Sequence, residues 1–331
     1  MKRLILFISA GLITALILIQ AYCWFIHPEI QFYKKADTVC THYEQTIRAA
    51  AAPCYVLAGG SETKTSLSPA IMAMEAGISA INTALAAGFG LEANTRAAIS
   101  HLQAGDTLVL GLLSTQGKNA LAAETGIKLN IQLFGLQAFR HGIIPLNCRN
   151  ILGILSSDAS NMLVSLVRKL TRGYAFIYNK QSTLHPDSWM QVHRNVIPGT
   201  EISSYIDDDI IIQPECVSLL NRLQATCRNL QADFVVMLPV GYTNEYETKR
   251  RLMHALQLTR MGIPVLRDER LGREPDSSLY SDTMFHMNAR GTDQNSRIIA
   301  RLLKEKSYWT EQELLERMNA RGFTVDDTPQ K

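Results

Sequence analysis

Three residues that are far apart in the chain have side chains suited to nucleophilic catalysis. Ser61 follows the apolar run CYVLA and two glycines (residues 54–60), and Asp282 precedes His286 by four residues in the segment SDTMFHMNARG. A serine hydroxyl becomes a strong nucleophile when a nearby base takes its proton and a third group orients that base. We therefore predict that Ser61, His286 and Asp282 meet in the fold as nucleophile, base and orienting carboxylate.

Each half of this pattern also has an ordinary explanation. A strand that ends in two glycines and a serine is more often a packing turn or a phosphate-binding loop, although GGSETK lacks the spacing of a P-loop. An aspartate four residues before a histidine is more often a surface pair or a helix cap. The order along the chain favours a shared site, because the serine follows the first predicted strand and the pair follows the last.

The elements that must position these residues alternate between strands and helices. Short, continuously apolar segments predict buried strands, and apolar residues at helical spacing predict the helices between them. This alternation predicts an α/β fold, a three-layer α/β/α sandwich whose mainly parallel sheet is covered on both faces. We predict strands within residues 54–60, 77–82, 104–113, 232–241 and 263–268, and helices at residues 91–103, 216–231, 247–262, 295–306 and 310–322.

The first residues have the composition of a membrane-spanning helix. No charged residue occurs from Leu4 to Ile26, a length that suffices for a helix across a bilayer. The two basic residues before this segment favour a cytoplasmic amino terminus, and Tyr22 and Trp24 stand where aromatic side chains favour the membrane interface. We expect an uncleaved transmembrane anchor at residues 1–26. A cleaved signal peptide is the alternative, but IQAYCWF offers no A-x-A cleavage pattern.

The rest of the chain is expected to form a connector and one large domain. Residues 27–52 predict a connector helix, and residues 53–331 predict a single α/β domain. The segment at about 117–205 interrupts the alternation and is predicted to be an insertion. It contains an amphipathic helical pattern at 160–178 and a polar, loop-like stretch at 185–209. Its composition is compatible with covering an active site or with lying against a membrane.

Composition argues against several other functions. The net charge is +3 at pH 7, and two of these charges precede the apolar segment, so the remaining chain is nearly neutral. Because no basic patch is interleaved with aromatic residues, nucleic-acid binding is not expected. The 6 cysteines are scattered, and no clustered Cys or His spacing predicts a metal site. We therefore expect neither a metal nor another cofactor.

The two end motifs together resemble those of the SGNH hydrolase superfamily. LAGGSETKTSLSP (57–69) is similar to the strand and G-x-S-like turn of its first block. DTMFHMNARG (282–291) is similar to the D-x-x-(Y/F)-H-L-N-x-x-G block of a membrane-anchored subgroup that includes DltD-like proteins and alginate and peptidoglycan O-acetylation proteins. The similarity continues through residues 80–110. It covers residues 54 to about 303, with the insertion loosely matched, and implies an SGNH- or flavodoxin-like α/β domain.

The resemblance also implies how a tetrahedral intermediate would be stabilised. Backbone amides at Gly60 and Ser61 and in the loop near Gly88 would form an oxyanion hole, each donor contributing roughly a few kcal/mol. The superfamily places an asparagine donor after its third strand, whereas this chain has GLLSTQG there. Gln116 or Thr115 would have to replace that asparagine, or backbone amides alone would serve.

The function implied by the resemblance is acyl-ester chemistry at a bacterial envelope. Ser61 would accept an acyl group and pass it to a sugar hydroxyl of a cell-envelope polysaccharide, as an O-acyltransferase, or to water, as an esterase. The domain would lie on the periplasmic or extracellular side of the inner membrane, beside a membrane-bound O-acyltransferase that supplies the acyl group. The alternative is a non-catalytic accessory or scaffold protein for that acyltransferase, docking through the apolar stretch 129–146. The intact serine, histidine and aspartate favour the enzyme, and the missing asparagine favours the scaffold.

Four further polar residues are expected to be structural or solvated. Asn82 follows a predicted strand and is expected to tie a turn together, and Asn288 is expected to cap the closing helix. Arg273 and Arg290 could face an anionic substrate, although solvated arginines are the more common case.

Overall fold

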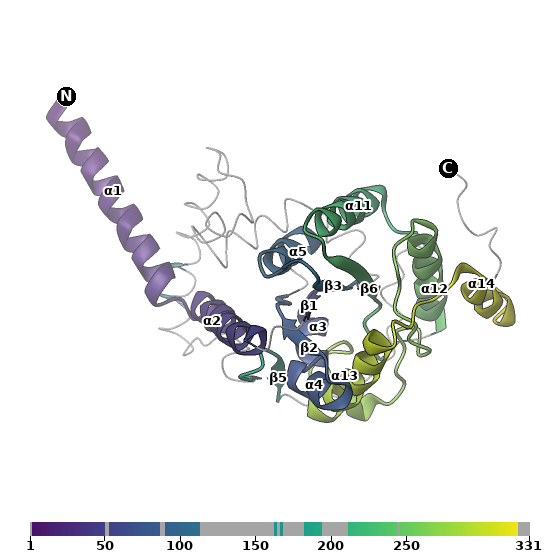
Figure 1. Cartoon of the computed structure of the whole chain (residues 1–331). Helices are drawn as coiled ribbons and strands as arrows, with labels where there is room; N and C mark the ends of the chain where they lie inside the picture. Colours follow the sequence, from purple (N-terminus) through teal and green to yellow (C-terminus); the bar gives the residue numbers. More distant parts are fainter. Residues whose placement is uncertain are drawn as a thin grey trace.

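A four-stranded parallel sheet forms the centre of the molecule (Figure 1). The computed structural model describes residues 2–49, 53–86, 90–112, 162–163, 166–167, 182–193, 211–243 and 245–323. The strand order is β2 (Ser79–Asn82), β1 (Cys54–Ala58), β3 (Thr107–Gly111) and β6 (Asp233–Met237), and every neighbouring pair is parallel. The predicted α/β fold with a mainly parallel sheet is confirmed, and so are the first four predicted strands.

The side chains of each strand alternate between two apolar cores, one on each face of the sheet. Along β1, Val56 and Ala58 pack in one core with Leu108 of β3, whereas Leu57 packs in the other core with Val109. Successive residues of a strand point to opposite faces of a sheet. The strands are apolar throughout because both of their faces are buried.

Helices cover both faces of the sheet (Figure 1). Two helices contribute apolar residues to the core around Leu57, namely α4 (Pro69–Ala76) and α13 (Ala289–Lys304). The short α3 (Ser61–Ser66) lies beside α13. Four helices contribute to the core around Val56: α5 (Leu91–Ile99), α11 (Pro214–Asn229), α12 (Glu245–Arg260) and α14 (Glu311–Ala320). The helices predicted at 91–103, 216–231, 247–262, 295–306 and 310–322 are therefore confirmed. No helix was predicted where α3 and α4 lie.

One strand prediction and one loop prediction were wrong in detail. The segment 263–268 does not form a regular strand, because its contact with the sheet is a single parallel bridge between Val265 and Val236. The stretch 185–209 was predicted to be loop-like, but its start belongs to an antiparallel hairpin of β4 (Ser182–Leu184) and β5 (Met190–Val192). Met190 and Val192 are buried, so apolar packing holds this hairpin despite the polar residues around it.

Two consecutive helices begin the chain. The first, α1 (Lys2–Phe25), projects away from the sheet, and the second, α2 (Pro28–Arg48), lies against the rest of the molecule (Figure 1). Among the described residues, no helix combines the length and the apolar composition needed to cross a bilayer. The expected transmembrane anchor is therefore not supported by the structure.

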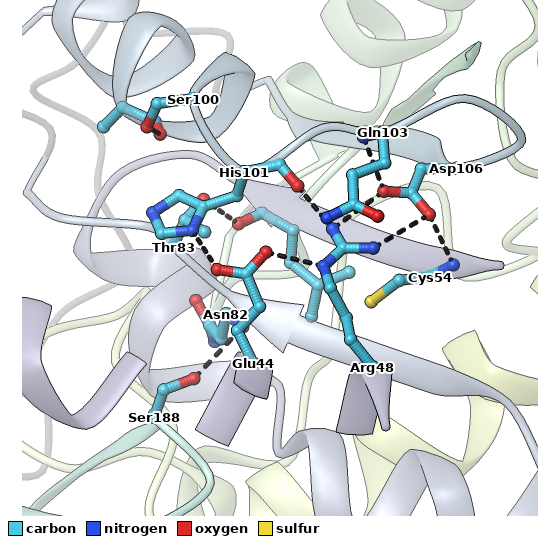
Figure 2. Close-up of polar contacts among 12 residues, drawn as sticks. Glu44, Arg48, Cys54, Asn82, Thr83, Ser100, His101, Gln103, Asp106 and Ser188 are labelled. Carbon is cyan, nitrogen blue, oxygen red and sulfur yellow. Dashed lines mark hydrogen bonds and ion pairs between the residues drawn. The ribbon is translucent and has the colours of Figure 1, made fainter. Parts of the chain in front are cut away.

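A polar cluster fastens the end of α2 to the sheet domain (Figure 2). The Arg48 guanidinium pairs with Glu44 at 2.7 Å and with Asp106 at 2.8 Å, and it also donates to the carbonyl of His101. The His101 ring Nδ1 lies 2.6 Å from Glu44 Oε2. Asp106 also accepts from the backbone N–H of Cys54 at the start of β1. These contacts fix the predicted connector helix against β1 and the turn before β3.

Several predicted features lie outside the described residues. Among them are the apolar stretch 129–146, most of the insertion at about 117–205 and nearly all of the helical pattern at 160–178. The division of the chain into an anchor, a connector and one domain also stays a prediction.

Candidate active site

Ser61 stands at the point where β1 ends and α3 begins. The turn between them needs a glycine at position 59, because its φ of +152° is one that other residues rarely adopt. A Cβ atom at Gly59 would also lie 2.3 Å from Thr63 Oγ1. The turn therefore places the Ser61 hydroxyl at the carboxyl edge of the sheet, beside the β1–β3 pair, which is where open parallel sheets bind their ligands.

The structure brings together the three side chains that the sequence predicted would meet. Ser61 Oγ lies 2.8 Å from His286 Nε2, and His286 Nδ1 lies 2.8 Å from Asp282 Oδ1. A carboxylate can only accept, so Nδ1 carries a proton toward Asp282. In the neutral ring Nε2 is then the acceptor, and the Ser61 hydroxyl donates to it. This is the arrangement in which a histidine can take the proton of a serine.

The loop that carries Asp282 and His286 is held by its own backbone. The Ser281 N–H donates to the His286 carbonyl at 2.8 Å, and a bridge joins Tyr280 to Met287 on either side. The Thr283 hydroxyl accepts from the His286 N–H at 3.1 Å. The 3₁₀ helix η2 (Ser277–Leu279) precedes this loop, and α13 follows it. These bonds turn the loop so that two side chains four residues apart converge.

Asp282 remains ionised in this setting. Burial acts to raise its pKa, but the hydrogen bond from His286 and its electrostatic attraction, with further hydrogen bonds from the loop, outweigh that effect. The net result is a pKa below the ordinary value of 3.8. A carboxylate that stays charged above this range can orient the imidazole and stabilise the imidazolium when it forms.

A buried carboxylate beside the nucleophile, that of Glu62, accepts a hydrogen bond from one of the predicted oxyanion donors, the Gly60 N–H. Glu62 is 2% exposed, and its Oε1 accepts from the Gly60 N–H at 2.8 Å. Burial raises the pKa of Glu62, while the hydrogen bond from Gly60 and the charges of His286 and Arg251 oppose the increase. Because its N–H already has a partner, Gly60 could act as an oxyanion donor only if this bond broke.

The remaining oxyanion donors stay predictions. Gly88, Gln116 and Thr115 lie outside the described residues. The Ser61 amide belongs to the first turn of α3, where N–H groups have no partner within the helix. It therefore stays the expected donor at the nucleophile.

A small pocket opens beside Ser61. Its enclosed part has room for about one water molecule, and the rest of its space is open to solvent. Its lining comes from four separate parts of the chain, namely α2, α3, the segment after β2, and the hairpin. The residues are Phe32, Tyr33, Ala36, Ser61, Lys64, Ala84, Leu85 and Met190. Apart from Ser61 and Lys64, this lining is apolar or aromatic. The pocket thus presents an apolar surface, open to solvent, next to the serine hydroxyl.

The sequence did not identify Lys64 or the wall that α2 provides. Lys64 follows Ser61 by three residues on α3, a spacing that puts both on one helical face. That spacing could have been noticed if the segment after the glycines had been predicted to be a helix. Phe32 and Tyr33 carried no such signal, because nothing in their local pattern shows which element they contact.

The structure assigns the other polar candidates to structural roles. The Asn82 amide donates to the carbonyls of Thr63 and Leu67, which ties β2 to α3. Asn288 caps α13, since its Oδ1 accepts from the Gly291 N–H at 3.1 Å. Both structural predictions are confirmed. Arg273 donates to the carbonyl of Thr243, and Arg290 is exposed.

Within the part of the chain that the structure describes, no group of three or more His, Cys, Asp or Glu side chains could hold a metal ion. No protein-family model matches the chain, and a search of curated proteins found no match.

Proposed function

We propose that this protein is a serine acyl-ester enzyme that forms an acyl intermediate on Ser61. The observation that carries the proposal is the pair of 2.8 Å contacts that link Ser61 to His286 and His286 to Asp282. These contacts join a nucleophile, a base and an orienting carboxylate in the order that acyl transfer requires. The apolar pocket beside Ser61 supports the proposal, because its lining would contact the apolar part of an acyl group.

In the first half of the proposed reaction, His286 Nε2 takes the Ser61 proton as Oγ attacks the carbonyl carbon of an ester. The oxyanion of the tetrahedral intermediate would be stabilised by the Ser61 amide, at the start of α3. When the intermediate collapses, the bond to the leaving alcohol breaks and His286 returns the proton to that alcohol. The product is an acyl-Ser61 ester.

In the second half, an acceptor hydroxyl attacks the acyl-serine carbonyl while His286 again serves as base. If the acceptor is a sugar hydroxyl, the protein is an O-acyltransferase, and if it is water, the protein is an esterase. The triad chemistry is the same in both cases, because only the binding of the acceptor differs. Throughout, Asp282 orients the imidazole and stabilises its charged form.

The resemblance to membrane-anchored SGNH proteins extends the proposal to a place and a partner. A cell-envelope polysaccharide would be the acceptor, and a membrane-bound O-acyltransferase would deliver the acyl group on the periplasmic or extracellular side of the inner membrane. This part of the proposal is supported by the resemblance alone. Cell fractionation would test it, and recovery of the chain with cytoplasmic enzymes would contradict it.

The first test is hydrolysis of a chromogenic acetyl ester by the whole protein and by Ser61→Ala. We expect the variant to lose turnover by on the order of 10³-fold or more. Ser66→Ala is the matched control, because Ser66 lies on the same short helix but does not line the pocket. Equal turnover by the wild-type protein and Ser61→Ala would contradict the proposal. If neither protein hydrolyses the ester, envelope polysaccharide acylation that persists in cells carrying Ser61→Ala would favour the scaffold alternative.

A further inference from the structure

Lys64 shares both a helix face and a pocket with the nucleophile. It follows Ser61 by three residues on α3, and residues at this spacing are neighbours on a helix surface. Both residues line the pocket that opens beside α2 and the β4–β5 hairpin. A group bound near the Ser61 hydroxyl would therefore also lie near the Lys64 side chain.

The surroundings of Lys64 are unusual for an ammonium group. The residue is 4% exposed, and the other pocket residues around it, such as Phe32, Tyr33 and Met190, are aromatic or apolar. A charge in such surroundings is unfavourable unless a partner compensates for the lost water. Lysine is among the residues least often buried without a partner.

The partners that Lys64 has within the described structure are few. Its Nζ donates to the Asn82 carbonyl at 2.8 Å, and with the described residues it forms no ion pair. The carboxylate of Asp187 is already engaged, because its Oδ2 accepts from the Ser68 hydroxyl at 2.6 Å and from a backbone N–H. An ammonium group has three N–H donors, so Lys64 retains capacity for a ligand.

Three titratable groups near Lys64 favour its charged form, but burial outweighs them. Asp37 and Cys40 on α2 act on its charge together with Asp187 of the hairpin turn. Burial raises the pKa of Cys40 to about 11, so this thiol is neutral at pH 7. Burial lowers the pKa of Lys64 itself to about 8, so the group is still mostly charged at pH 7. Lys64 thus brings a positive charge to the pocket beside Ser61, with the carboxylates of Asp37 and Asp187 nearby.

We infer that Lys64 determines which acyl groups the pocket accepts: it favours a short acyl group that ends in a carboxylate and rejects one that carries an ammonium group. This inference rests on the proposed function, because it assigns the pocket to the acyl group. The attraction and the repulsion have the same origin, since a charge in low-dielectric surroundings acts strongly on another charge a few ångströms away. The pocket would accept an uncharged acetyl group less well than the carboxylate-bearing acyl group and better than the ammonium-bearing one.

The test compares three p-nitrophenyl esters that differ in the charge of the acyl group: the hemisuccinate, the acetate and the glycinate. Wild-type protein is expected to give a kcat/KM at least tenfold higher for the hemisuccinate than for the glycinate at pH 7. Lys64→Met, which removes the charge at similar volume, is expected to reduce this ratio by at least tenfold. Lys35→Met is the matched control, because Lys35 is exposed on α2, and its ratio is expected to equal that of the wild type.

A binding measurement keeps this inference separate from the proposed function. The melting temperature of each protein is measured with sodium propionate and with propylammonium chloride at equal ionic strength. We expect propionate to raise the melting temperature of the wild type and of Lys35→Met more than propylammonium does, and Lys64→Met to lose this difference. Circular dichroism confirms that each variant is folded, and Lys64→Gln replaces the methionine variant if that one does not fold.

The outcomes then separate cleanly. If Ser61 turns over all three esters with the same ratios in wild type and Lys64→Met, the inference about Lys64 is wrong while the proposed function stands. If no ester is turned over but propionate binds in a Lys64-dependent way, the anion-selective pocket stands, and the proposed function fails if envelope polysaccharide acylation also persists in cells carrying Ser61→Ala. If neither selectivity nor propionate binding depends on Lys64, the inference is overturned.

Discussion

The burial of Lys64 predicts how the free energies of unfolding of the wild type and of Lys64→Met differ as the pH changes. Burial lowers the pKa of Lys64 from its ordinary value of 10.5 to about 8. In the unfolded chain the side chain is exposed and keeps its ordinary value. A tenfold change in a protonation equilibrium is worth about 1.4 kcal/mol. The buried charge therefore destabilises the folded protein at pH 7 by about 3 kcal/mol relative to its uncharged form.

The sign of the pH dependence follows from proton counting. Between pH 8 and 10.5 the unfolded protein holds the Lys64 proton and the folded protein does not, so the stability of the folded state rises with pH. Below pH 8 both states hold the proton, and the full cost of burying the charge is present. Lys64→Met has no such group. The free energy of unfolding of the wild type should therefore increase relative to that of the variant by about 3 kcal/mol from pH 7 to pH 10.5.

Urea unfolding of both proteins at pH 7, 8, 9 and 10 measures this difference. Other groups that titrate in this range, such as the tyrosines, are common to both proteins and cancel in the comparison. Lys35→Met is expected to follow the wild type at each pH, because Lys35 is exposed. A wild-type minus Lys64→Met difference that stays constant across this range would refute the reasoning, since it would mean that Lys64 is not desolvated.

Three further predictions concern the turn, the α2 contact and the triad. Gly59→Ala should lower the free energy of unfolding, measured with urea, by at least about 2 kcal/mol, because the new Cβ would clash with Thr63 at an already unfavourable φ. Gly77→Ala is the control: its φ is also positive but the space around it is open, so it should cost about 1 kcal/mol. Asp106→Asn should destabilise the protein by about 2 kcal/mol and speed amide hydrogen exchange in α2, because it weakens the pair with Arg48; unchanged exchange would count against that contact. Asp282→Asn should lower ester turnover by about 10²- to 10⁴-fold. The pKa of Asp282 is lower in the folded protein than in the unfolded chain, so its charge stabilises the fold above pH 3.8 and this stabilisation is lost as the pH falls further. Urea unfolding should therefore show the wild type losing stability relative to Asp282→Asn below pH 3.8.

The sheet and the triad could be predicted from the sequence because their signals are local or ordered along the chain. Continuously apolar runs identified β1, β2, β3 and β6, since burial on both faces leaves no polar alternation. The order along the chain, with Ser61 after the first strand and Asp282 and His286 after the last predicted strand, favoured their meeting, and the family resemblance supported it. The segment 263–268 has the composition of a strand but joins the sheet through only one bridge, and hydrogen-bond register is not encoded in composition.

The pocket could not be predicted, because its wall comes from parts of the chain without a shared pattern. Phe32 lies on the connector helix, and Met190 lies on a hairpin within a segment that looked polar. The charge of Lys64 matters only because these elements bury it. The end of α2 is held by Arg48 and Asp106, two residues whose pairing across 58 positions leaves no trace in local sequence. Long-range packing thus forms the pocket and buries Lys64, whereas sequence pattern predicts the meeting of Ser61, His286 and Asp282.

The most direct test of the central claim is covalent labelling of the folded protein with a fluorophosphonate, followed by mass-spectrometric mapping of the modified residue. Such reagents react with serine hydroxyls that are activated by a base. The proposed function predicts a single label on Ser61 in the wild type and loss of that label in His286→Ala. The absence of label on Ser61 in the wild type, or equal labelling of Ser61 in His286→Ala, would contradict the claim that His286 activates Ser61.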